Sequence, residues 1–378
     1  MKVTHIFWSL GFGGIETMLV NIANAQAEAG AEVGIILIDD QVESSLREAL
    51  NSCVTVHMIG RRKGGLLLGA IYKLNCLLAK LSPDVIHLHG SVFYKMIFIR
   101  RLRLVSCSTL HALPTGAVRG IVGYLWRKLW RKSLPYSNVT SIDKVPQVFA
   151  ISNSVQQALH DNYGVESTVV YNGIVTSRFA ARPGRMPGGQ LRIVMVSRLE
   201  HDKKGQDLLI RAVAVLQGEV TVDFIGIGSS MEYLRLLTAE LHAGEYVRFL
   251  GKQTQDYVAA HLADYDLFVQ PSRWEGFGLT VAEAMAAGVP VLVSEGQGPA
   301  EVTQGNRYGW VFTNGDAVGL QRQIAFIKEH YGEAMTKAGK AKDYVRNTYD
   351  VSVTAQTYLQ EYEKIVCKWS NSKKDNAD

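Results

Sequence analysis

Two carboxylates flank a glycine-containing turn in the second half of the chain. Seven residues separate Glu275 from Glu283, and Gly276 and Gly278 lie between them. An apolar run that ends at Gln270 precedes the turn, and a helical pattern follows it. Glycine lets the backbone approach a ligand closely, and the amides and dipole at a helix start favour a diphosphate. The segment therefore predicts a diphosphate-binding turn between two acidic side chains.

Glu283 also has a purely structural interpretation. The helix is expected over about residues 280–287, and Thr280 stands three positions before Glu283. This Thr-x-x-Glu spacing is that of a capping box, in which both side chains satisfy amides at the helix start. Ligand binding and capping remain open together, since a carboxylate has two oxygens.

Other short motifs accompany this turn along the chain. In order they are Gly13-Gly14-Ile15-Glu16, Thr109-Leu110-His111, Ala150-Ile151-Ser152, Tyr171-Asn172-Gly173, Ser197-Arg198-Leu199 with Lys204-Gly205, Gly226-Ile227-Gly228 and Pro299-Ala300-Glu301. With the E-x7-E spacing and the segment Ala286-Ala287-Gly288-Val289-Pro290-Val291, they resemble the retaining glycosyltransferases of family four. The resemblance covers nearly the whole chain. It implies the GT-B fold, with a nucleotide-sugar donor held in a cleft between two domains.

The resemblance implies four catalytic residues. Arg198 and Lys204 would hold the donor pyrophosphate, as a bidentate fork and a point charge. Glu275 would bind hydroxyls of the transferred sugar, and His111 would contact that sugar from the N-terminal domain. The family usually has one residue fewer before its Lys-Gly pair, so the neighbouring Lys203 remains the alternative to Lys204.

The resemblance also implies the donor-binding residues. Glu283 would accept hydrogen bonds from the ribose hydroxyls, and the backbone around Lys252 and Gln253 would select the base. The remaining contacts would come from backbone amides around the diphosphate. The whole donor-binding set is Gly13, Gly14, Lys252, Gln253, Gly276, Phe277, Gly278, Leu279, Thr280 and Glu283.

The expected chemistry needs no metal or other cofactor. We expect no Asp-x-Asp pair where a divalent ion could bridge a diphosphate. Cationic groups and amides aimed at the leaving diphosphate would stabilise the transition state. The family's favoured mechanism is attack on the same face, with the leaving phosphate taking the acceptor proton. A covalent role for Glu275 is the alternative.

Two parallel sheets are expected to position these residues. Near-continuous apolar runs alternate with helical patterns, which is typical of parallel sheets covered on both faces. The expected strands are Val3–Ser9, Val33–Ile38, Val54–Ile59, Asp84–His89, Leu102–Leu110, Gln147–Ile151 and Thr168–Tyr171, and then Leu191–Ser197, Val220–Ile225, Val247–Leu250, Leu267–Gln270, Val289–Val293 and Trp310–Phe312. The fold class is therefore α/β, with two doubly wound, Rossmann-like domains.

Breaks in these patterns predict the domain boundaries. The expected parts are an acceptor-side domain over 1–178, a linker over 179–190 and a nucleotide-sugar-binding domain over 191–345. A helix over 346–366 would pack back on the first domain, a polar tail would follow over 367–378, and residues 370–378 would be disordered.

Composition and charge limit the class of protein. The chain has 378 residues and a net charge of +5, and it lacks a long apolar stretch or a signal-peptide pattern. Its four cysteines lack metal-ligand or paired spacing, which favours a reduced cytoplasmic protein. Fourteen basic residues and one acid lie between Arg61 and Pro135, a balance that attracts phosphate groups.

Residues 118–134 predict a basic amphipathic helix. Apolar residues, including Trp126 and Trp130, fall on one side, and Arg127 and Lys128 fall on the other. Such a helix can lie on an anionic membrane, which would bring the enzyme to a lipid-linked acceptor at the inner face of the membrane. A packed helix with solvated charges is the alternative.

Other functions compete with glycosyl transfer. A dehydrogenase is disfavoured because Glu16 stands where a nicotinamide-binding loop needs its third glycine. A sugar-nucleotide epimerase and a non-catalytic nucleotide-sugar-binding module remain alternatives, and no nucleic-acid motif is present. His87 and His89 lie at strand spacing without an evident third metal ligand, so they are expected to be structural or to line the rim of the site. A UDP-sugar and a glycan or lipid-linked acceptor are the expected substrates.

Overall fold

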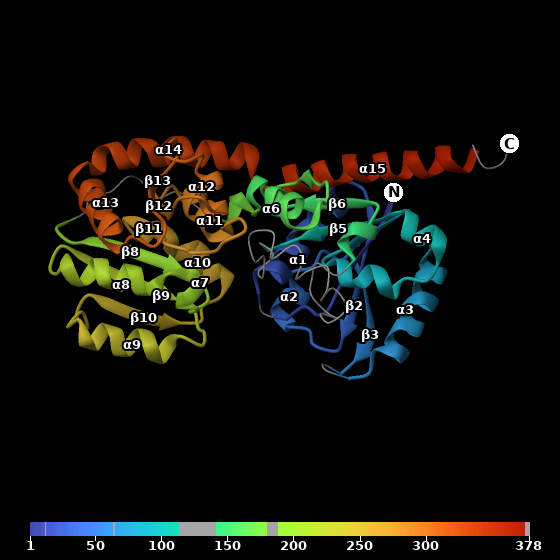
Figure 1. The fold of residues 1–378 in the computed structure, drawn as a ribbon, viewed down its shortest axis with the longest axis horizontal. Helices are drawn as coiled ribbons and strands as arrows, with labels where there is room; N and C mark the ends of the chain where they lie inside the picture. The colour runs from blue at the N-terminus through green and yellow to red at the C-terminus, as the bar shows by residue number, and fades with distance from the viewer. Residues whose placement is uncertain (12, 63–64, 113–140, 180–187, 375–378) are drawn as a thin grey trace. The chain divides into compact units, whose positions relative to one another are not determined.

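A computed structural model describes the whole chain except residues 12, 63–64, 113–140, 180–187 and 375–378 (Figure 1). The chain divides into two compact units. The first contains Met1–Gly173 and Val351–Asp378, and the second contains Ile174–Asp350. Within the described residues, no helix combines the length and hydropathy needed to cross a bilayer.

The first unit is built on a seven-stranded parallel sheet. Its strands are β1 (Lys2–Phe7), β2 (Glu32–Asp39), β3 (Thr55–Arg61), β4 (Val85–Leu88), β5 (Ser106–Leu110), β6 (Gln147–Ala150) and β7 (Thr168–Val169), in the order β3-β2-β1-β4-β5-β6-β7. Its helices are α1 (Gly14–Glu28), α2 (Ser44–Glu48), α3 (Leu67–Leu81), α4 (Arg100–Leu104), α6 (Asn153–Tyr163) and α15 (Val351–Lys374), with short 3-10 turns at Ser91–Met96 and Ile142–Lys144. Buried apolar residues in the central strands provide the core.

The second unit is built on a six-stranded parallel sheet. Its strands are β8 (Leu191–Val196), β9 (Val220–Ile225), β10 (Val247–Gly251), β11 (Leu267–Gln270), β12 (Val291–Ser294) and β13 (Trp310–Phe312), in the order β10-β9-β8-β11-β12-β13. Its helices are α7 (His201–Lys204), α8 (Gln206–Val215), α9 (Met231–Glu240), α10 (Gln255–His261), α11 (Leu279–Ala286), α12 (Gly298–Val302), α13 (Ala317–Glu329) and α14 (Tyr331–Thr348), with 3-10 turns at Thr176–Arg178 and Leu262–Asp264. Buried side chains such as Phe224, Leu237 and Ile324 form one continuous core.

Both strand orders reverse next to the first strand of the unit. The reversal lies between β1 and β4 in the first sheet and between β8 and β11 in the second. In open α/β sheets, ligands bind outside the carboxyl ends of the strands at such a switch point. The expected fold class, α/β with two doubly wound parallel-sheet units, is confirmed.

The structure differs from the expected elements at one strand and at the C-terminus. The strand expected over Leu102–Leu110 begins only at Ser106, because Arg100–Leu104 form α4. The final helix was expected to end at 366 but continues to Lys374, so the prediction of disorder from Ser370 was wrong for 370–374. The side chain of Trp369 gives a physical reason, since the Arg101 guanidinium lies 5.4 Å from the centre of its ring.

The unit boundaries also differ from the expected ones. Residues 174–178 and 346–350 group with the second unit rather than with the parts that the sequence suggested. The Ile174 amide donates to the Tyr349 carbonyl at 2.9 Å, and the Asp350 carboxylate accepts from the Thr176 hydroxyl at 2.5 Å. These bonds fasten the segment after Gly173 to the end of α14. Beyond Asp350, helix α15 packs against α1 of the first unit.

Candidate functional site

The turn between β11 and α11 lies at the switch point of the second sheet. Two glycines shape it. Gly278 has φ +96°, and a Cβ there would lie 3.0 Å from Pro299 Cγ. A Cβ at Gly298 would lie 2.4 Å from the Gly276 carbonyl carbon. The backbone of the turn therefore packs directly on the start of α12, where a larger residue would displace it.

The N-cap of α11 is Gly278, and no side chain caps this helix start. Thr280 lies inside the first turn of the helix, so the capping-box interpretation of Thr280 and Glu283 was wrong. The first amides of a helix have no partner within the helix. Those of Leu279 and Thr280 therefore begin α11 next to the glycine turn, in the position that a phosphate group would need.

Glu283 is a buried carboxylate with unused hydrogen-bonding capacity. Its Oε2 atom is buried and has no partner among the described residues. Burial raises the pKa of Glu283 to about 7, and the charge of Arg178 partly opposes this rise. A buried acceptor without a donor is costly, and ligand hydroxyls would relieve that cost.

Lys204 and Glu275 are brought together although 70 residues separate them in the chain. The Lys204 ammonium forms an ion pair with Glu275 Oε2, and their side chains are 17% and 20% exposed. The loop of Glu275 is fixed in place because the Arg273 amide donates to the Lys203 carbonyl at 2.7 Å. The Lys203 ammonium instead pairs with Glu200 and is 52% exposed. Lys204 is therefore the lysine that belongs to the turn.

Gly205 explains how α7 comes so close to this loop. It has φ +72°, and a Cβ there would lie 2.0 Å from the Pro271 carbonyl oxygen. The side chain of Arg273 then joins the two segments by a bidentate ion pair with Asp207, with both N–O distances at 2.8 Å. Sequence reasoning missed Arg273, Asp207 and Gly298, because each supports the turn through a partner that is distant in sequence.

Arg198 follows β8 on the other side of the switch point. Its side chain is 72% exposed, and its Nη1 atom lies 3.2 Å from Glu200 Oε1. An exposed guanidinium at this edge can reorient towards a phosphate at little cost. The loop is packed closely, since a Cβ at Gly226 would lie 2.0 Å from the Ser197 carbonyl oxygen.

Lys252 and Gln253 follow β10, the edge strand of the same sheet. The Gln253 side-chain amide donates to the Leu250 carbonyl at 2.9 Å, which fixes the loop. Lys252 is exposed. All the expected site residues of the second unit thus follow the carboxyl ends of strands β8, β10 and β11.

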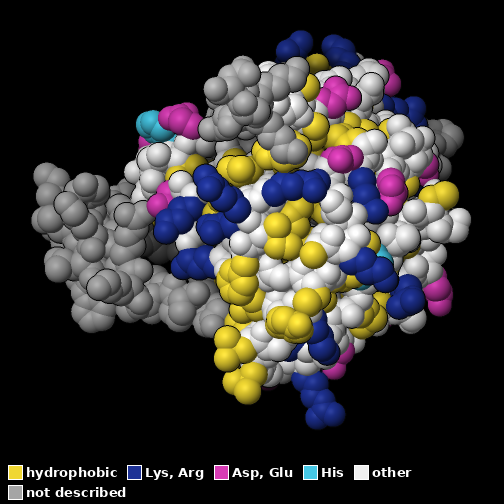
Figure 2. Space-filling view, turned by 90° about the vertical axis from the view of Figure 1, so that its right-hand side faces the viewer, with side chains coloured by type: hydrophobic (Ala, Val, Ile, Leu, Met, Phe, Trp, Pro, Cys, Tyr) yellow, Lys and Arg dark blue, Asp and Glu magenta, His cyan; other side chains and the backbone are white. Residues whose placement is uncertain are grey.

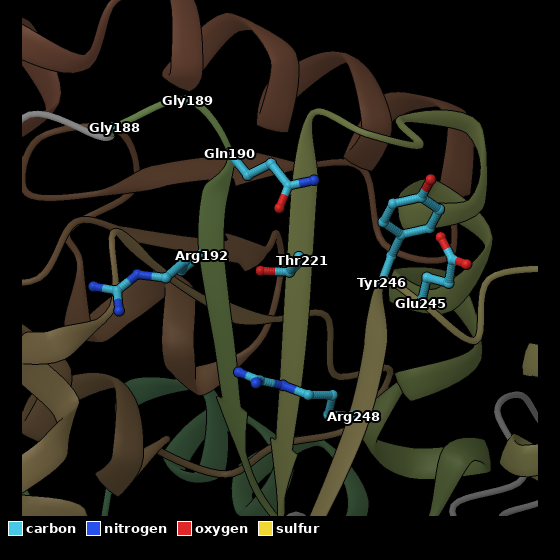
Figure 3. A pocket seen from close by; sticks show the side chains of 8 residues that line it. All are labelled: Gly188, Gly189, Gln190, Arg192, Thr221, Glu245, Tyr246 and Arg248. Atoms are coloured by element: carbon cyan, nitrogen blue, oxygen red, sulfur yellow. The ribbon is translucent and has the colours of Figure 1, made fainter.

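A separate hollow lies at the amino ends of the strands, away from the glycine turn at their carboxyl ends (Figure 3). Its lining side chains stand at the amino ends of β8, β9 and β10, on the face that Figure 3 shows. They include Arg248, which is held by Asp223 at 2.6 and 2.7 Å. The hollow does not coincide with the glycine turn and contains none of the expected site residues.

One Asp-x-Asp pair occurs in the sequence, Asp264-Tyr265-Asp266. Asp264 and Asp266 lie at the amino end of β11, away from the glycine turn at its carboxyl end. The Asp266 carboxylate accepts from the Arg192 amide at 2.8 Å, and Asp264 Oδ2 lies 2.9 Å from His261 Nδ1. The pair therefore has structural partners and is not placed to bridge a diphosphate at the turn.

In the first unit, Gly13 and His111 stand at the carboxyl ends of β1 and β5. Gly13 is the N-cap of α1, which begins at Gly14. A Cβ at Gly13 would meet the carboxylate of Glu16, the movable end of a side chain, so this glycine is less constrained than Gly278. The expected amphipathic helix 118–134 lies outside the described residues.

His111 is connected to a histidine cluster that sequence reasoning saw only in part. Its Nε2 atom lies 2.9 Å from His89 Nδ1, and burial lowers the pKa of His111 to about 3. His5 also belongs to the cluster, since parallel pairing places it beside His87. One ring nitrogen each of His5, His87 and His89 lie within 4.8 Å of one another, a grouping that could hold a metal. Alternation along two paired strands was the available signal for His5.

Both halves of the chain match known glycosyltransferase families. Residues 178–347 match the family described as glycosyl transferases group 1, and residues 12–178 match glycosyltransferase family 4. Glycogen synthase of Mycobacterium tuberculosis H37Rv is 28% identical over 288 residues, which are 73% of this chain and 69% of that protein.

Two further relatives differ in the nucleotide that their names contain. A GDP-mannose-dependent α-(1-6)-phosphatidylinositol monomannoside mannosyltransferase of M. tuberculosis H37Rv is 30% identical over 191 residues. That match covers 45% of this chain and 49% of the enzyme, so the chain spans about half the length of this relative. The crystal structure of Anabaena HepE with UDP and glucose has a TM-score of 0.77 at 22% identity, covering 96% of this chain and 100% of HepE.

The family matches together extend over nearly the whole chain, and the fold agrees with them. At 22% identity, the likeness to HepE shows only that the two proteins share a fold. The chain therefore belongs to the family-four glycosyltransferases, and it is an enzyme of the GT-B fold.

Proposed function

We propose that this glycosyltransferase moves a hexose from a UDP-sugar to a hydroxyl of a glycan or lipid-linked glycan, with retention of anomeric configuration. The main support is the Lys204–Glu275 ion pair beside the glycine turn at the switch point. It places a cation for a phosphate and a carboxylate for sugar hydroxyls at one position. Neither a metal nor another cofactor takes part in the proposed reaction.

The diphosphate of the donor is assigned to the start of α11. Amides of Gly276, Phe277, Gly278, Leu279 and Thr280 surround its distal phosphate, and Arg198 and Lys204 supply the positive charge. As the glycosyl–phosphate bond breaks, negative charge grows on the diphosphate, so these groups bind the transition state more tightly than the substrate. The leaving phosphate then takes the proton of the attacking hydroxyl.

The nucleoside is assigned to the other loops of the second unit. Ribose hydroxyls donate to Glu283, whose buried Oε2 lacks a donor among the described residues. Backbone around Lys252 and Gln253 binds the base. From the first unit, Gly13, Gly14 and His111 are assigned to the phosphate and the transferred sugar.

The bases named for two similar proteins differ. HepE was crystallised with UDP and glucose, whereas the name of the mannosyltransferase specifies GDP-mannose. We favour a UDP-sugar and a role in polysaccharide biosynthesis, with a GDP-sugar as the alternative.

Thermal unfolding with UDP, GDP, ADP, CMP and NAD, each with a chelator present, tests the donor assignment. A ligand at 100 times its Kd adds about 2.7 kcal/mol to the free energy of unfolding. We expect UDP to raise the Tm despite the chelator, and Arg198→Ala and Glu283→Ala to abolish that rise. A rise with NAD alone, or only after metal is restored, would contradict the proposal.

Epimerase activity and a purely binding role are separated by the products. A UDP-sugar labelled in the sugar should pass its label to a glycan acceptor with release of UDP. An isomerised UDP-sugar without an acceptor would identify an epimerase, and binding without any product would identify a non-catalytic module. NMR of the new glycosidic bond distinguishes retention from inversion.

A surface of the first unit supports contact with an anionic membrane. The exposed apolar side chains of Leu66, Leu68, Tyr72 and Phe98 are 89%, 81%, 72% and 69% accessible. We call these residues on and beside α3 the α3 surface. Lys73 and Lys80 on α3 and Arg100 and Arg101 on α4 are exposed as well. Figure 2 shows hydrophobic side chains among Lys and Arg on this side of the molecule.

Hydrogen bonds join the parts of this surface. The Asn75 side chain donates to the Met96 carbonyl and accepts from the Phe98 amide, both at 2.8 Å, so α3 holds Phe98 beside it. Arg101 donates to the Ser82 hydroxyl at 3.1 Å, which joins α4 to the end of α3. Exposed apolar side chains bordered by cations match an anionic bilayer, where each Lys or Arg contributes about 1 kcal/mol.

Sedimentation with vesicles containing phosphatidylglycerol tests this assignment. We expect the protein to pellet at low salt, and Leu68→Ser with Phe98→Ser to reduce the bound fraction at least about fivefold, because both lose apolar burial. Leu236→Ser, at a 61% exposed position on α9, is the matched control. Trp126→Ser with Trp130→Ser measures the separate contribution of residues 118–134. No binding at low salt would exclude the membrane role.

A further inference from the structure

Four histidines form a row across the carboxyl ends of the central strands of the first sheet. His5 lies on β1, His87 on β4, and His89 and His111 directly after β4 and β5. The ring centres of His87 and His89 are 4.5 Å apart, and those of His89 and His111 are 5.1 Å apart. Burial lowers the pKa of His5 to about 4, and it also lowers the pKa values of His87 and His89. The imidazoles are therefore neutral near pH 7.

Hydrogen bonds connect His111 to the interior through two of these rings. His111 Nε2 lies 2.9 Å from His89 Nδ1, and His89 Nε2 lies 3.0 Å from His5 Nδ1. His5 Nε2 lies 2.8 Å from Gln26 Oε1 on α1. This series of hydrogen bonds is open at His111, because His111 Nδ1 is buried and has no partner among the described residues.

At its inner end, this series of hydrogen bonds reaches Tyr362 on α15. The Gln26 side-chain amide donates to the Tyr362 hydroxyl at 3.4 Å, and that hydroxyl lies 2.5 Å from His87 Nδ1. His87 Nε2 lies 2.7 Å from the Thr109 hydroxyl, which lies 3.0 Å from the Tyr358 hydroxyl. Tyr362 therefore lies on the path to His111, whereas Tyr358 lies on a side branch.

The chemistry of the groups determines which atom donates in each of these hydrogen bonds. A neutral imidazole has one N–H donor and one acceptor nitrogen. A phenol is a better donor than acceptor, so Tyr362 donates to His87 and accepts from the Gln26 amide. Gln26 Oε1 is then left to accept from His5 Nε2. By the same rule, His5 Nδ1 accepts from His89, and His89 Nδ1 accepts from His111 Nε2.

We propose that Tyr362, Gln26, His5 and His89 are positioning residues that hold His111 as its neutral Nε2–H tautomer and so present Nδ1 as an acceptor for a sugar hydroxyl. The role of the sugar rests on the proposed function. The unpartnered, buried Nδ1 atom requires a donor, and a hydroxyl of the transferred sugar is the donor that the reaction provides. A site of this kind discriminates strongly against a sugar that lacks the hydroxyl, because the buried acceptor would stay unpaired.

A metal on His5, His87 and His89 is the competing interpretation. Every ring nitrogen of these three residues already has a hydrogen-bond partner within the protein. A metal would have to displace several of those bonds from a fully buried cluster. The test below therefore includes metal analysis of the purified protein.

Two tyrosines one helical turn apart supply a matched pair of variants. Tyr362→Phe removes the hydroxyl that orients Gln26, while Tyr358→Phe removes a buried hydroxyl from the side branch. Both leave a ring of the same shape in the core. Gln26→Glu is a third variant, for use if Tyr362→Phe fails to fold. Its carboxylate still accepts from His5 Nε2, so this variant should preserve the tautomer of His111.

The tautomers are read by 15N NMR of the full chain labelled at histidine, with the His111 signals assigned from His111→Ala. At pH 7.5 we expect a single Nε2–H form of His111 in the wild-type, Tyr358→Phe and Gln26→Glu proteins, and a mixture of tautomers in Tyr362→Phe. A protonated Nδ1, a charged imidazolium or a bound metal in the wild type would overturn the proposal. An unchanged single tautomer in Tyr362→Phe would also overturn it.

Kinetics then separates this inference from the proposed function. With an active donor and acceptor, Tyr362→Phe should lower kcat/KM about tenfold, as expected for one misdirected hydrogen bond, while Tyr358→Phe stays within about twofold. The affinity for UDP should be the same in both. Equal losses in both variants would assign Tyr362 a merely structural role. If no donor is turned over, the proposed function has failed, yet the NMR result still decides the tautomer.

Discussion

At the scale of single residues, the site depends on side chains that the fold keeps charged or unpaired. Lys204 pairs with Glu275 before any donor binds, so the two groups screen each other until phosphate and sugar hydroxyls replace that contact. Lys203 lies next to Lys204 in sequence, but its ammonium pairs with Glu200, the N-cap residue of α7. This difference could not be read from two adjacent lysines, because the choice depends on how Gly205 turns the chain.

The lysine pair gives a direct mutational test. Lys204→Ala should lower kcat/KM at least about 100-fold, since the developing diphosphate charge loses a preorganised cation worth about 3 kcal/mol. Lys203→Ala should stay within about threefold. Steady-state kinetics of the two variants measures the contrast, and equal losses would remove Lys204 from the phosphate site.

Glu283 predicts a pH dependence of stability. Its pKa is about 7 in the folded enzyme against 4.5 when unfolded, so ionisation favours the unfolded chain. The cost is absent below about pH 4.5, grows as the pH rises, and reaches roughly 3 kcal/mol above pH 7. Without ligand, Glu283→Gln should therefore be more stable than the wild type at pH 8 and equal to it at pH 4.5. Denaturant unfolding at both pH values measures this, and a variant that is less stable at pH 8 would refute the assignment.

At the scale of elements, the glycine turn is the feature that sequence predicted best. The strand ending at Gln270 and the helix after Gly278 follow from apolar pattern and glycine placement, and they lie where expected. The helix cap was misread, because the N-cap of α11 is Gly278 rather than Thr280. His5 was missed because its partner on the neighbouring strand, His87, is 82 positions away in the chain. The last turns of α15 were missed because Trp369 contacts Arg101 only in the folded unit.

Gly278 can be compared with a nearby glycine that shares its conformation but not its surroundings. Gly278 has φ +96° and Pro299 close by, whereas Gly296 has φ +70° and open space around its Cα. Gly296→Ala should cost about 1 kcal/mol, the backbone term alone. Gly278→Ala should cost more, about 2 to 3 kcal/mol, and should also abolish the UDP-dependent rise in Tm by moving the turn. Melting curves with and without UDP test both effects. Retained UDP binding in Gly278→Ala would show that the turn does not hold the diphosphate.

At the scale of the whole molecule, the two units differ in how the chain builds them. The second unit is one continuous segment, Ile174–Asp350, while the first is assembled from both ends of the chain. All the residues assigned to the nucleotide and diphosphate, except those of the Gly13 loop, lie in the continuous segment. The first unit depends on the return of α15, whose Tyr358 and Tyr362 are buried beside the histidines.

This asymmetry predicts that the fragment 174–350 folds and binds UDP by itself. It contains a complete six-stranded sheet with its own core, and the Ile174 and Thr176 contacts to the end of α14 close the segment on itself. We expect a cooperative melt and a Kd for UDP within about tenfold of the full chain, because the ribose, base and most phosphate contacts remain. The fragment should not transfer sugar, since His111 is absent. The fragment 1–173 should fail to fold, because without α15 it exposes the apolar surface that Tyr358 and Tyr362 cover. Calorimetry and circular dichroism of the two fragments test this. UDP binding that needs residues 1–173 would place essential nucleotide contacts in the first unit and overturn the present assignment.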